Sequence, residues 1–319
     1  MTAIELRPAT ADDLPDLCVL HQRAQRHDGV PQVIQLDELE EELDDDHVSL
    51  AHDVRVATVD GSLAGYAYTF HLPSEVREER CYVFGEVDPD WRRHGVGTAL
   101  MRWAIPRAET QLRSSGRSLP QYIRTDSYDF IEGAHQLFAS LGMTVVRYTD
   151  ELLRPLDDLP PVTSPASARI LPWPDDRDEE IRLAKNEAFA DHWGSTPTAA
   201  QHWEQMVRGY GARPDLSFIA VDDDGRVIGH CLNKRFEADD GLLGRRDAWI
   251  DNLGTRREWR GKGVASSLIA HSLHAFAAAD CTHASISVDS ENPTGAAHLY
   301  RRLGFEPQHR SITHEIALA

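Results

Sequence analysis

The sequence of 319 residues is poor in cysteine and in lysine. Its four cysteines, at positions 18, 81, 231 and 281, are far apart and form no Cys-x-x-Cys pair. Neither a disulfide framework nor a zinc site is therefore expected, and buried apolar thiols are the simpler interpretation. Lysine occurs only at positions 185, 234 and 262. Nearly all basic side chains are arginine, which coding bias explains as well as function does.

Long apolar runs are also missing from the sequence. No segment reaches the roughly 18 consecutive apolar residues of a membrane span, and the start MTAIELRPATADDLPDL has no signal-peptide core. The formal net charge of -19 argues against nucleic acid or an anionic membrane as the main partner. These absences predict a soluble, cytoplasmic protein that is a monomer or a homodimer.

A repeated segment is the most informative feature that is present. The sequence WRRHGVGTAL begins at Trp91, and its near copy WRGKGVASSL begins at Trp259. A second pair follows, HQLFASLGM from His135 and HLYRRLGF from His298. The spacing of the two pairs differs by only a few residues, which indicates duplication of a whole domain.

The two copies predict two domains joined by a linker. The segment from 152 to 167 is rich in proline, serine and aspartate and lacks helical or strand periodicity. We therefore expect an N-terminal domain over residues 1–151, a linker over 152–167 and a C-terminal domain over 168–319. The chain length agrees with two domains of about 150 residues each.

Each half shows the same expected order of elements. A strand and a helix precede a hairpin, whose turn is Asp60-Gly61 in one half and Asp224-Gly225 in the other. A strand then enters the repeated segment, which is followed by a helix, a strand, a short helix and a closing strand. Pro106 is expected to kink the first of these helices. The pattern predicts an α/β (α+β) fold with a mixed, mostly antiparallel sheet flanked by helices.

The repeated segment has the properties of a phosphate cradle. A strand ends, a glycine-rich turn follows, and a helix begins, so unpaired N–H groups and the positive end of the helix dipole meet there. The arginine at 92 or 260 either orients the loop or contacts a phosphate directly. The segment matches neither the Walker nor the Rossmann glycine pattern.

Both copies fit the pattern [RQ]-x-x-G-x-[GA], through Arg92, Gly95 and Gly97 and through Arg260, Gly263 and Ala265. With the opening IELRPATADDLPDL and the ending LYRRLGFEP, each half resembles the GCN5-related N-acetyltransferase family, so the chain looks like two such domains in tandem. The resemblance implies that the loop binds the pyrophosphate of acetyl-CoA, and that pantetheine lies where two parallel strands splay apart. It implies cofactor contacts at Gly85, Val87, Leu253, Thr255, Gly261, Val264 and Asn292, in addition to the motif residues.

In the second half, the resemblance assigns Tyr300 as the proton donor to the departing thiolate. Asn292 would bond pantetheine or the helix entry, although an Asn-Pro turn explains it almost as well. The base is expected to be Asp251, because the family's glutamate position holds Trp249 here and Asp251 lies two residues further along the strand. Glu237 or a water-relayed base are alternatives. No metal is expected.

The first half lacks these groups. By the same alignment, Phe138 and Phe130 stand at the tyrosine and asparagine positions, and Cys81 and Val83 stand at those of Trp249 and Asp251. Phenylalanine cannot donate a proton, although Tyr128 lies nearby. The first domain is therefore expected to be catalytically weak or inactive, whether or not it holds acetyl-CoA.

The expected acceptor is a primary amine of a small molecule. The tandem arrangement resembles the mycothiol synthases of the family, which implies the cysteine amine of a cysteinyl-glucosaminyl-inositol. The sequence departs from them at ADHWGSTP, residues 190–197, where Asp191, His192 and Trp193 are candidates for contact with an amine or sugar. An aminoglycoside-type acceptor, a protein lysine and a non-enzymatic acyl-CoA sensor or scaffold are the alternatives.

Overall fold

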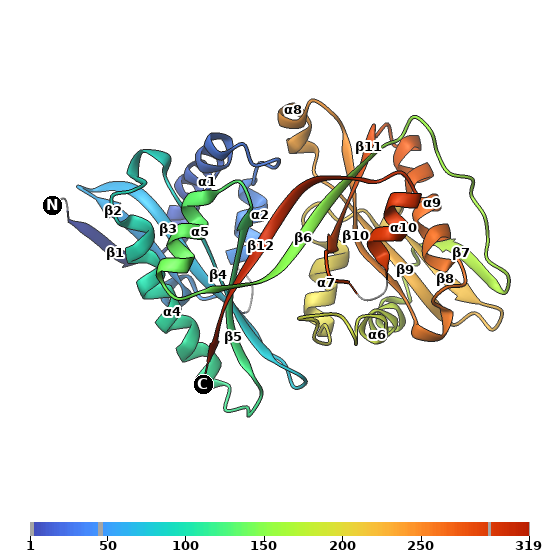
Figure 1. Cartoon of the computed structure of the whole chain (residues 1–319), viewed down its shortest axis with the longest axis horizontal. Coiled ribbons are helices and arrows are strands. Elements are labelled where there is room, and N and C mark those ends of the chain that lie inside the picture. Colours follow the sequence, from blue (N-terminus) through green and yellow to red (C-terminus); the bar gives the residue numbers. More distant parts are fainter. Residues whose placement is uncertain (1–2, 44–46, 293–294, 319) are drawn as a thin grey trace. The chain divides into compact units, whose positions relative to one another are not determined.

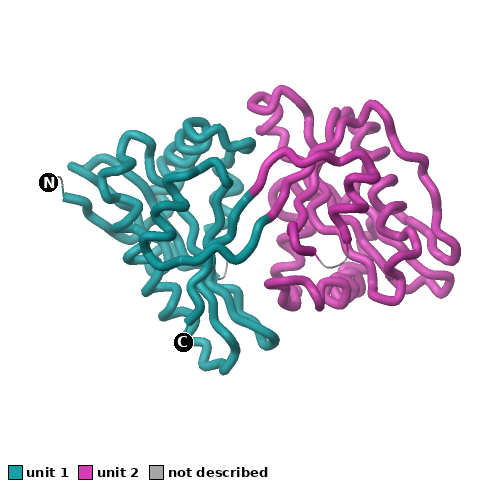
Figure 2. The backbone as a smooth tube through the Cα atoms, viewed as in Figure 1, with its two compact units in different colours: residues 1–148, 311–319 teal, residues 149–310 magenta. Residues whose placement is uncertain are grey.

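The computed structural model describes residues 3–43, 47–292 and 295–318 of the chain. They form two compact units: Met1–Tyr148 with Ser311–Ala319, and Thr149–Arg310 (Figure 2). Each unit has a central sheet with helices packed against it (Figure 1). In the described residues, no helix combines the length and the apolar composition needed to cross a bilayer.

Among its described residues, the first unit contains five complete strands and five α-helices, with the first part of one further strand and most of another. They are β1 (Ile4–Pro8), α1 (Leu14–Asp28), α2 (Leu36–Leu43), α3 (Leu50–Asp53), β2 (Val54–Val59), β3 (Ser62–Leu72), β4 (Glu79–Val87), α4 (Val96–Ser114), β5 (Gln121–Tyr128), α5 (Glu132–Ser140), β6 (Thr144–Pro155) and β12 (Glu306–Leu318). The sheet order in this unit is β1-β2-β3-β4-β5-β12.

The second unit repeats this plan. Its further elements are β7 (Ala168–Pro172), α6 (Asp178–Ala188), α7 (Ala200–Arg208), β8 (Phe218–Asp222), β9 (Val227–Arg235), α8 (Asp240–Leu243), β10 (Asp247–Thr255), α9 (Val264–Ala278), β11 (His283–Asp289) and α10 (Ala296–Arg302). The sheet order is β6-β11-β10-β9-β8-β7. In each unit β4–β5 or β10–β11 is a parallel pair and its neighbouring pairs are antiparallel, which confirms the predicted fold class.

Local sequence explains the hairpins. Asp60 and Gly61 have φ angles of 49° and 79°, the left-handed backbone that a tight two-residue turn between twisted strands requires. In the second unit Gly225 has a φ of 83°, and the Asp222 carboxylate accepts bonds from the N–H groups of Asp224 and Arg226. Helix α4 continues through Pro106 and does not end there.

The closing strands are exchanged between the two halves of the sequence. Residues Thr149–Pro155 of β6 pair with β11, and Ser311–Leu318 of β12 pair with β5. This corrects the expectation of contiguous domains over 1–151 and 168–319, because each closing strand completes the sheet of the other half. The two strands have equivalent β patterns, so the sequence carried no local sign of which partner each would take.

A buried ion pair fixes the exchanged β12 in the first unit. Arg124 on β5 is only 1% exposed, and its Nε donates to Glu315 Oε2 on β12 at 2.7 Å. Its Nη1 also donates to Glu78 Oε1 at 2.8 Å. A buried guanidinium is costly to leave without a carboxylate partner, so β12 and β5 are tied together by more than their backbone bonds.

The expected linker is shorter than 152–167 and is packed on the second unit. Residues 152–155 belong to β6, and 156–167 contain no helix or strand. Leu156 lies in the hydrophobic core. His274 on α9 contacts the carbonyl oxygen of Pro160 at 2.9 Å, and the Ser267 hydroxyl donates to the carbonyl of Thr163.

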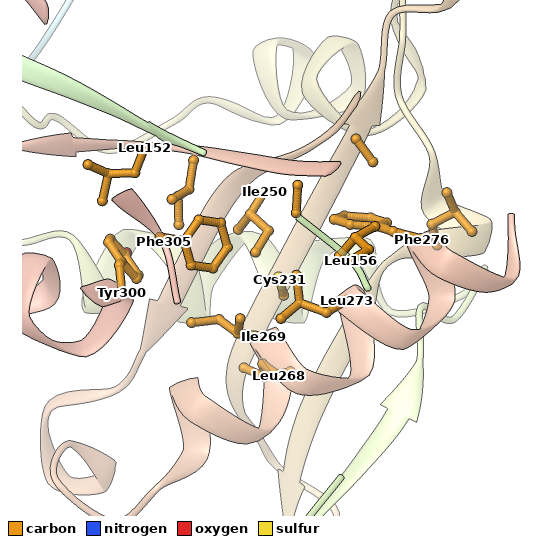
Figure 3. Packing of buried hydrophobic residues seen from close by; sticks show 14 of the residues in the cluster. Leu152, Leu156, Cys231, Ile250, Leu268, Ile269, Leu273, Phe276, Tyr300 and Phe305 are labelled. Carbon is orange, nitrogen blue, oxygen red and sulfur yellow. The ribbon is translucent and has the colours of Figure 1, made fainter. Parts of the chain in front are cut away.

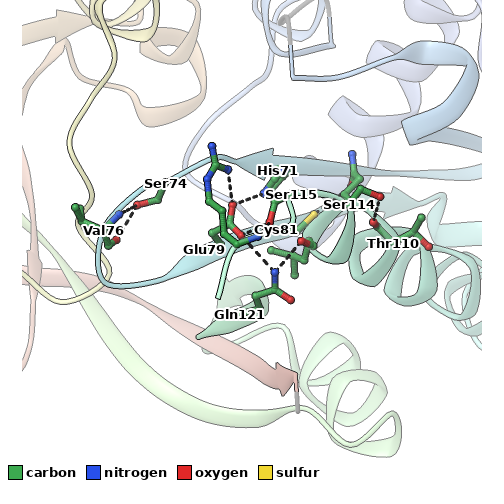
Figure 4. Close-up of polar contacts among 12 residues, drawn as sticks. His71, Ser74, Val76, Glu79, Cys81, Thr110, Ser114, Ser115 and Gln121 are labelled. Atoms are coloured by element: carbon green, nitrogen blue, oxygen red, sulfur yellow. Dashed lines mark hydrogen bonds and ion pairs between the residues drawn. The ribbon is translucent and has the colours of Figure 1, made fainter. Parts of the chain in front are cut away.

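A buried carboxylate anchors the beginning of β4. Glu79 accepts hydrogen bonds from Ser115 (2.5 Å), Arg117 (2.9 Å) and Gln121 (3.3 Å), which lie after α4 and at the start of β5 (Figure 4). Burial by itself would raise the pKa of this carboxyl, but the hydrogen bonds outweigh it and hold the pKa below its usual range. The contacts fix β4 beside β5 at the end remote from the repeated loop.

Candidate active site

The two repeated loops have nearly identical backbones. Arg92 and Arg260 have φ/ψ of -66°/149° and -65°/149°, and the helix caps Gly95 and Gly263 have 91°/-2° and 85°/-1°. Helices α4 and α9 begin at the next residue, two residues before the expected helices TALMRWAIPRAE and SSLIAHSLHAFAAA. Both loops therefore present the N–H groups of a helical first turn at the end of a strand.

The second loop has open space around its glycines. A Cβ added at Gly261 or Gly263 would meet no atom within 4 Å. The positive φ of 73° at Gly261 is matched in the first loop by Arg93, at 64°. The unpaired N–H groups, the helix dipole and this open approach fit a pyrophosphate.

The structure favours the loop-orienting role for the two arginines. Arg92 Nε donates to the carbonyl of Val87 at 3.2 Å, and its two terminal nitrogens bond both oxygens of Asp28, at the end of α1. Arg260 Nη2 donates to the carbonyl of Ala188 at 2.7 Å, at the end of α6. Each guanidinium thus joins its loop to the first helix of its own unit.

The parallel strands splay apart in both units. Pairing of β10 with β11 covers Asp247–Ile250 with His283–Ile286, and pairing of β4 with β5 ends at Tyr82 and Arg124. The strands continue beyond these points, so Leu253, Thr255, Gly85 and Val87 lie in the splayed part. The Thr255 hydroxyl oxygen is buried and has no hydrogen-bond partner among the described residues. Orphaned donors beside an open edge fit the amide-rich pantetheine arm of acetyl-CoA.

Tyr300 lies on α10 with its ring in the core of the second unit. It is 6% exposed and packs at an angle against Phe305, with ring centroids 6.2 Å apart (Figure 3). Burial raises its pKa well above the usual range, so the phenol remains protonated at neutral pH. A neutral phenol can donate a proton. At the same position in the first unit, Phe138 is packed into a core with Cys81 and Val83.

Asp251 occupies an irregularity in β10. The register with β9 shifts between Ile250 and Asn252, so Asp251 is the extra residue of a β-bulge. Its Oδ1 lies 3.6 Å from Lys234 Nζ, and Lys234 stands opposite Trp249 in the ladder. The side chain therefore reaches the face of Trp249, as the sequence predicted. Bulges bend a strand and re-aim side chains, which suits a residue beside the splay.

The alternative base Glu237 is placed elsewhere. It follows β9, whose Arg235 pairs with Ala248 at the beginning of β10. The loop lies at the opposite end of β10. Glu237 is therefore far along the strand from the splayed region, while Asp251 is next to it.

Asn292 contacts His192, which the sequence analysis had named as a candidate for contact with the acceptor. Its Nδ2 donates to His192 Nε2 at 3.0 Å. Pro293 and Thr294 lie outside the described residues, and with them the Asn-Pro turn. The neighbouring Asp191 forms ion pairs with Arg257 and Arg260. The segment after α6, which continues past Ala188 and has left-handed Gly194 (φ 65°), thus joins the loop to Asn292.

Thr198 fixes the far end of this segment. Its backbone N–H donates to Asn186 Oδ1 at 2.8 Å, and its carbonyl accepts from Arg182 at 2.6 Å. Lys185, only 7% exposed, donates to the Thr198 hydroxyl. None of these three α6 side chains was predicted. Their common partner lies twelve or more residues along the chain, so no local pattern identifies them.

Sequence analysis also missed polar groups behind the splayed strands. In the second unit His230 contacts Asn252 Oδ1 at 2.8 Å and fills the space beside Gly254. Burial lowers the pKa of this imidazole to about 4, so it is neutral. In the first unit Tyr66, His21 and Glu86 occupy the corresponding face. The described residues hold no cluster of three or more metal-ligand side chains.

The sequence model of the Acetyltransferase (GNAT) family matches residues 16–123 and 179–305, one stretch in each half. The chain belongs to this family. Both matches contain the loop and the strand before it, and members of the family are acetyltransferases. The chain is therefore an N-acetyltransferase, and acetyl-CoA is its co-substrate.

Full-length relatives agree with this assignment. The chain is 29% identical to a mycothiol acetyltransferase of Mycobacterium sp. (strain JLS) over 96% of both proteins. A solved GCN5-related N-acetyltransferase from Sphaerobacter thermophilus is 26% identical, with a TM-score of 0.73 over 98% of this chain and 95% of that one. A tandem GNAT protein from the clavulanic acid biosynthesis pathway, 18% identical, shares the fold with a TM-score of 0.74 over 99% of this chain and 98% of that one.

Proposed function

We propose that acetyl transfer takes place in the second unit, onto a primary amine of a small molecule. The observation that carries this proposal is the buried, protonated Tyr300 in the unit whose loop ends at Gly263. The matching position of the first unit, Phe138, has no proton to give. The loops are equivalent in backbone, so the difference between the units lies in the groups that perform proton transfer.

The residues of the second unit divide the work of the reaction. N–H groups of Gly261, Gly263, Val264 and Ala265 would hold the pyrophosphate, and the backbone at Leu253 and Thr255 would hold pantetheine, with Arg260 supporting the loop. Acetyl-CoA supplies an acetyl thioester. Asn292, which contacts His192, would bond pantetheine or the entry of the helix that follows.

Two side chains would then move protons. Asp251 accepts a proton from the ammonium group of the acceptor, directly or through water, which leaves a neutral amine. The amine nitrogen forms a bond to the acetyl carbon, loses its second proton to water, and the carbon–sulfur bond breaks. Tyr300 gives its proton to the departing sulfur and regains one from solvent. The products are an acetamide, coenzyme A and one released proton.

The acceptor to be tested first is the cysteine amine of a mycothiol precursor. Support comes from the relatives named mycothiol acetyltransferases, which match 96% of this chain. The segment with Asp191, His192 and Trp193 is where this chain departs from the mycothiol synthases that it resembles. An amino-sugar acceptor of the aminoglycoside type is therefore the second compound to assay.

The variant Tyr300→Phe tests the catalytic assignment. It should lower kcat by about 100-fold, the lower range of general acid–base effects, while calorimetric binding of acetyl-CoA remains. Tyr210→Phe is the matched control, because Tyr210 stacks on Phe236, next to Glu237 and away from the loop. Unchanged kcat in Tyr300→Phe would remove the proposed role. Binding of acetyl-CoA without transfer to either acceptor would favour a sensor or scaffold.

A further inference from the structure

Three titratable side chains of the first unit form a chain on the face of β3 and β4 opposite α4. The Tyr66 hydroxyl lies 2.6 Å from His21 Nδ1, and His21 Nε2 lies 3.8 Å from Glu86 Oε1. Tyr66 and Glu86 stand directly opposite each other in the ladder. None of the three belongs to the repeated loop or to the expected acetyl-transfer residues.

The protonation states of this chain follow from burial. Burial lowers the pKa of His21 to about 4 and raises that of Tyr66 well above its usual range, so both are neutral near pH 7. A neutral Tyr66 donates its O–H to Nδ1, and the remaining imidazole proton then sits on Nε2, on the side of Glu86. The distance of 3.8 Å to Glu86 is too long for a hydrogen bond.

Glu86 is thus a carboxylate without a donor. No described residue gives it a hydrogen bond, yet 29% of its side chain is accessible. Burial raises its pKa to about 7, with a smaller lowering by Arg92 and a raising by Asp28. Arg92 directs its guanidinium to Asp28 and to the carbonyl of Val87, and it forms no hydrogen bond with Glu86 among the described residues.

Aromatic rings extend from this carboxylate along the same face of β3 and β4. Tyr66 and Tyr68 are stacked with centroids 6.4 Å apart, Tyr68 and Phe84 are 5.5 Å apart, and Phe84 and Tyr82 are stacked at 5.7 Å. Phe84 and Tyr82 are half-buried, so parts of their rings remain accessible. Ring faces attract cations and pack against the organic part of an amine.

We propose that the first unit has a binding site for a primary ammonium ligand, whose N–H groups bond the Glu86 carboxylate and whose organic part packs on Phe84 and Tyr82. An ammonium group has three donors, and the carboxylate offers acceptors that no protein group fills. The site does not depend on catalysis in the second unit. That unit has no equivalent, because Gly254 stands at the position of Glu86 and the His230 ring fills the space.

The first test is calorimetric binding of benzylamine to the full chain at pH 8, without acetyl-CoA. Benzyl alcohol, which has the same ring and no charge, is the matched ligand. Benzylamine should bind about tenfold more tightly than benzyl alcohol, as expected for charge-assisted hydrogen bonds. Glu86→Gln should abolish this preference. Glu132→Gln, an exposed change on α5 of the same unit, should preserve it.

The second test is the pH dependence of benzylamine binding. Of the groups around Glu86, His21 and Tyr66 stay neutral between pH 6 and 8. Glu86 titrates in the middle of this window, while burial raises the pKa of Asp126 on β5, which interacts with Tyr68, to about 6. Affinity should fall about tenfold from pH 8 to pH 6 in the wild type, and this fall should be lost in Glu86→Gln, which keeps Asp126. Tyr66→Phe, which keeps the carboxylate, should retain this pH dependence and weaken binding by about threefold.

The results separate this proposal from its alternatives. Equal binding of benzylamine and benzyl alcohol, or an unchanged preference in a folded Glu86→Gln variant, would overturn it. A pH-independent affinity in both the wild type and Tyr66→Phe would overturn it as well. Loss of acetyl transfer in Tyr300→Phe has no bearing on these measurements, so the two proposals fail independently.

Discussion

The two units share a loop backbone to within a few degrees but differ at the strand position just before it. In the first unit Glu86 stands opposite Tyr66, and in the second Gly254 stands opposite His230. The loop is constrained by the φ/ψ angles that a strand-to-helix turn needs. The position before it has no such requirement, so duplication left it free to acquire a carboxylate in one copy and a packed imidazole in the other. Equivalence of the backbone is thus a poor guide to equivalence of chemistry.

The largest expected effect comes from removing the exchanged strand. Deletion of residues 311–319 should unfold the first unit, although the deleted residues are at the end of the second half of the sequence. It leaves β5 without its neighbour and Arg124 without Glu315. Hydrogen exchange measured by mass spectrometry should show loss of protection in β5, with protection in β9 and β10 retained.

A single substitution tests whether the ion pair between Arg124 and Glu315 contributes to this effect. Glu315→Gln in the full chain should destabilise the first unit by about 3 kcal/mol, as expected when one partner of a buried ion pair is removed. If β5 stays protected in the deletion variant, the exchanged pairing does not support the first unit.

A smaller effect is expected from Glu86→Gln, through pH. The folded pKa of about 7 lies above the unfolded value of about 4.3, so stability from this carboxyl is full below about pH 4. It is lost as pH rises from about 4 through 7; the full shift would correspond to about 4 kcal/mol, and screening at this 29% exposed side chain reduces the expected loss to roughly 2 kcal/mol. The variant should therefore be more stable than wild type at pH 8. Urea unfolding at pH 4.5 and 8 measures the difference.

The control for this experiment is again Glu132→Gln, whose stability should follow wild type at both pH values. An equal effect of Glu86→Gln at pH 4.5 and 8 would mean that its carboxyl is not perturbed by folding. The second unit, with glycine at this position, offers no corresponding change.

The smallest effect distinguishes the loops themselves. Gly261→Ala should destabilise the second unit by about 1 kcal/mol, because a residue with a Cβ is strained at a φ of 73°. Arg93→Gly should change the first unit by less than about 0.5 kcal/mol, since relief of strain is offset by the greater freedom of glycine in the unfolded chain. Thermal unfolding followed by calorimetry measures both. A larger loss in Arg93→Gly would show that its contact with Gln136 matters more than the backbone.

Features set by neighbouring residues could be predicted from the sequence. The Asp60-Gly61 turn, the presence of a helix after each repeated loop and the strand of Asp251 depend on local dihedral preferences and periodicity. The strand exchange could not be predicted, because β5 offers the same edge to either closing strand. The contact between Asn292 and His192 was also missed, because the two residues are 100 positions apart in the sequence.

Site residues were recognised as far as the repeated motif extended. The motif identified Arg92 and Arg260 but not their task, which depends on α1 and α6 ending beside them. Glu86 was passed over, although its neighbours Gly85 and Val87 had been selected. Strand alternation places it on the other face, where its importance comes from His21 and from missing donors that only a three-dimensional structure can reveal.

The exchanged strand also delays completion of the first unit during synthesis of the chain. Residue 311 follows Tyr148 by 163 residues, and a ribosome adds about 5–20 residues per second, so the first unit waits roughly 10–30 s for its last strand. During that time the edge of β5 is uncovered, and open strand edges invite association with other chains. If translation stalls in the second half of the chain, the unpaired edge of β5 in the first unit therefore stays exposed to other chains.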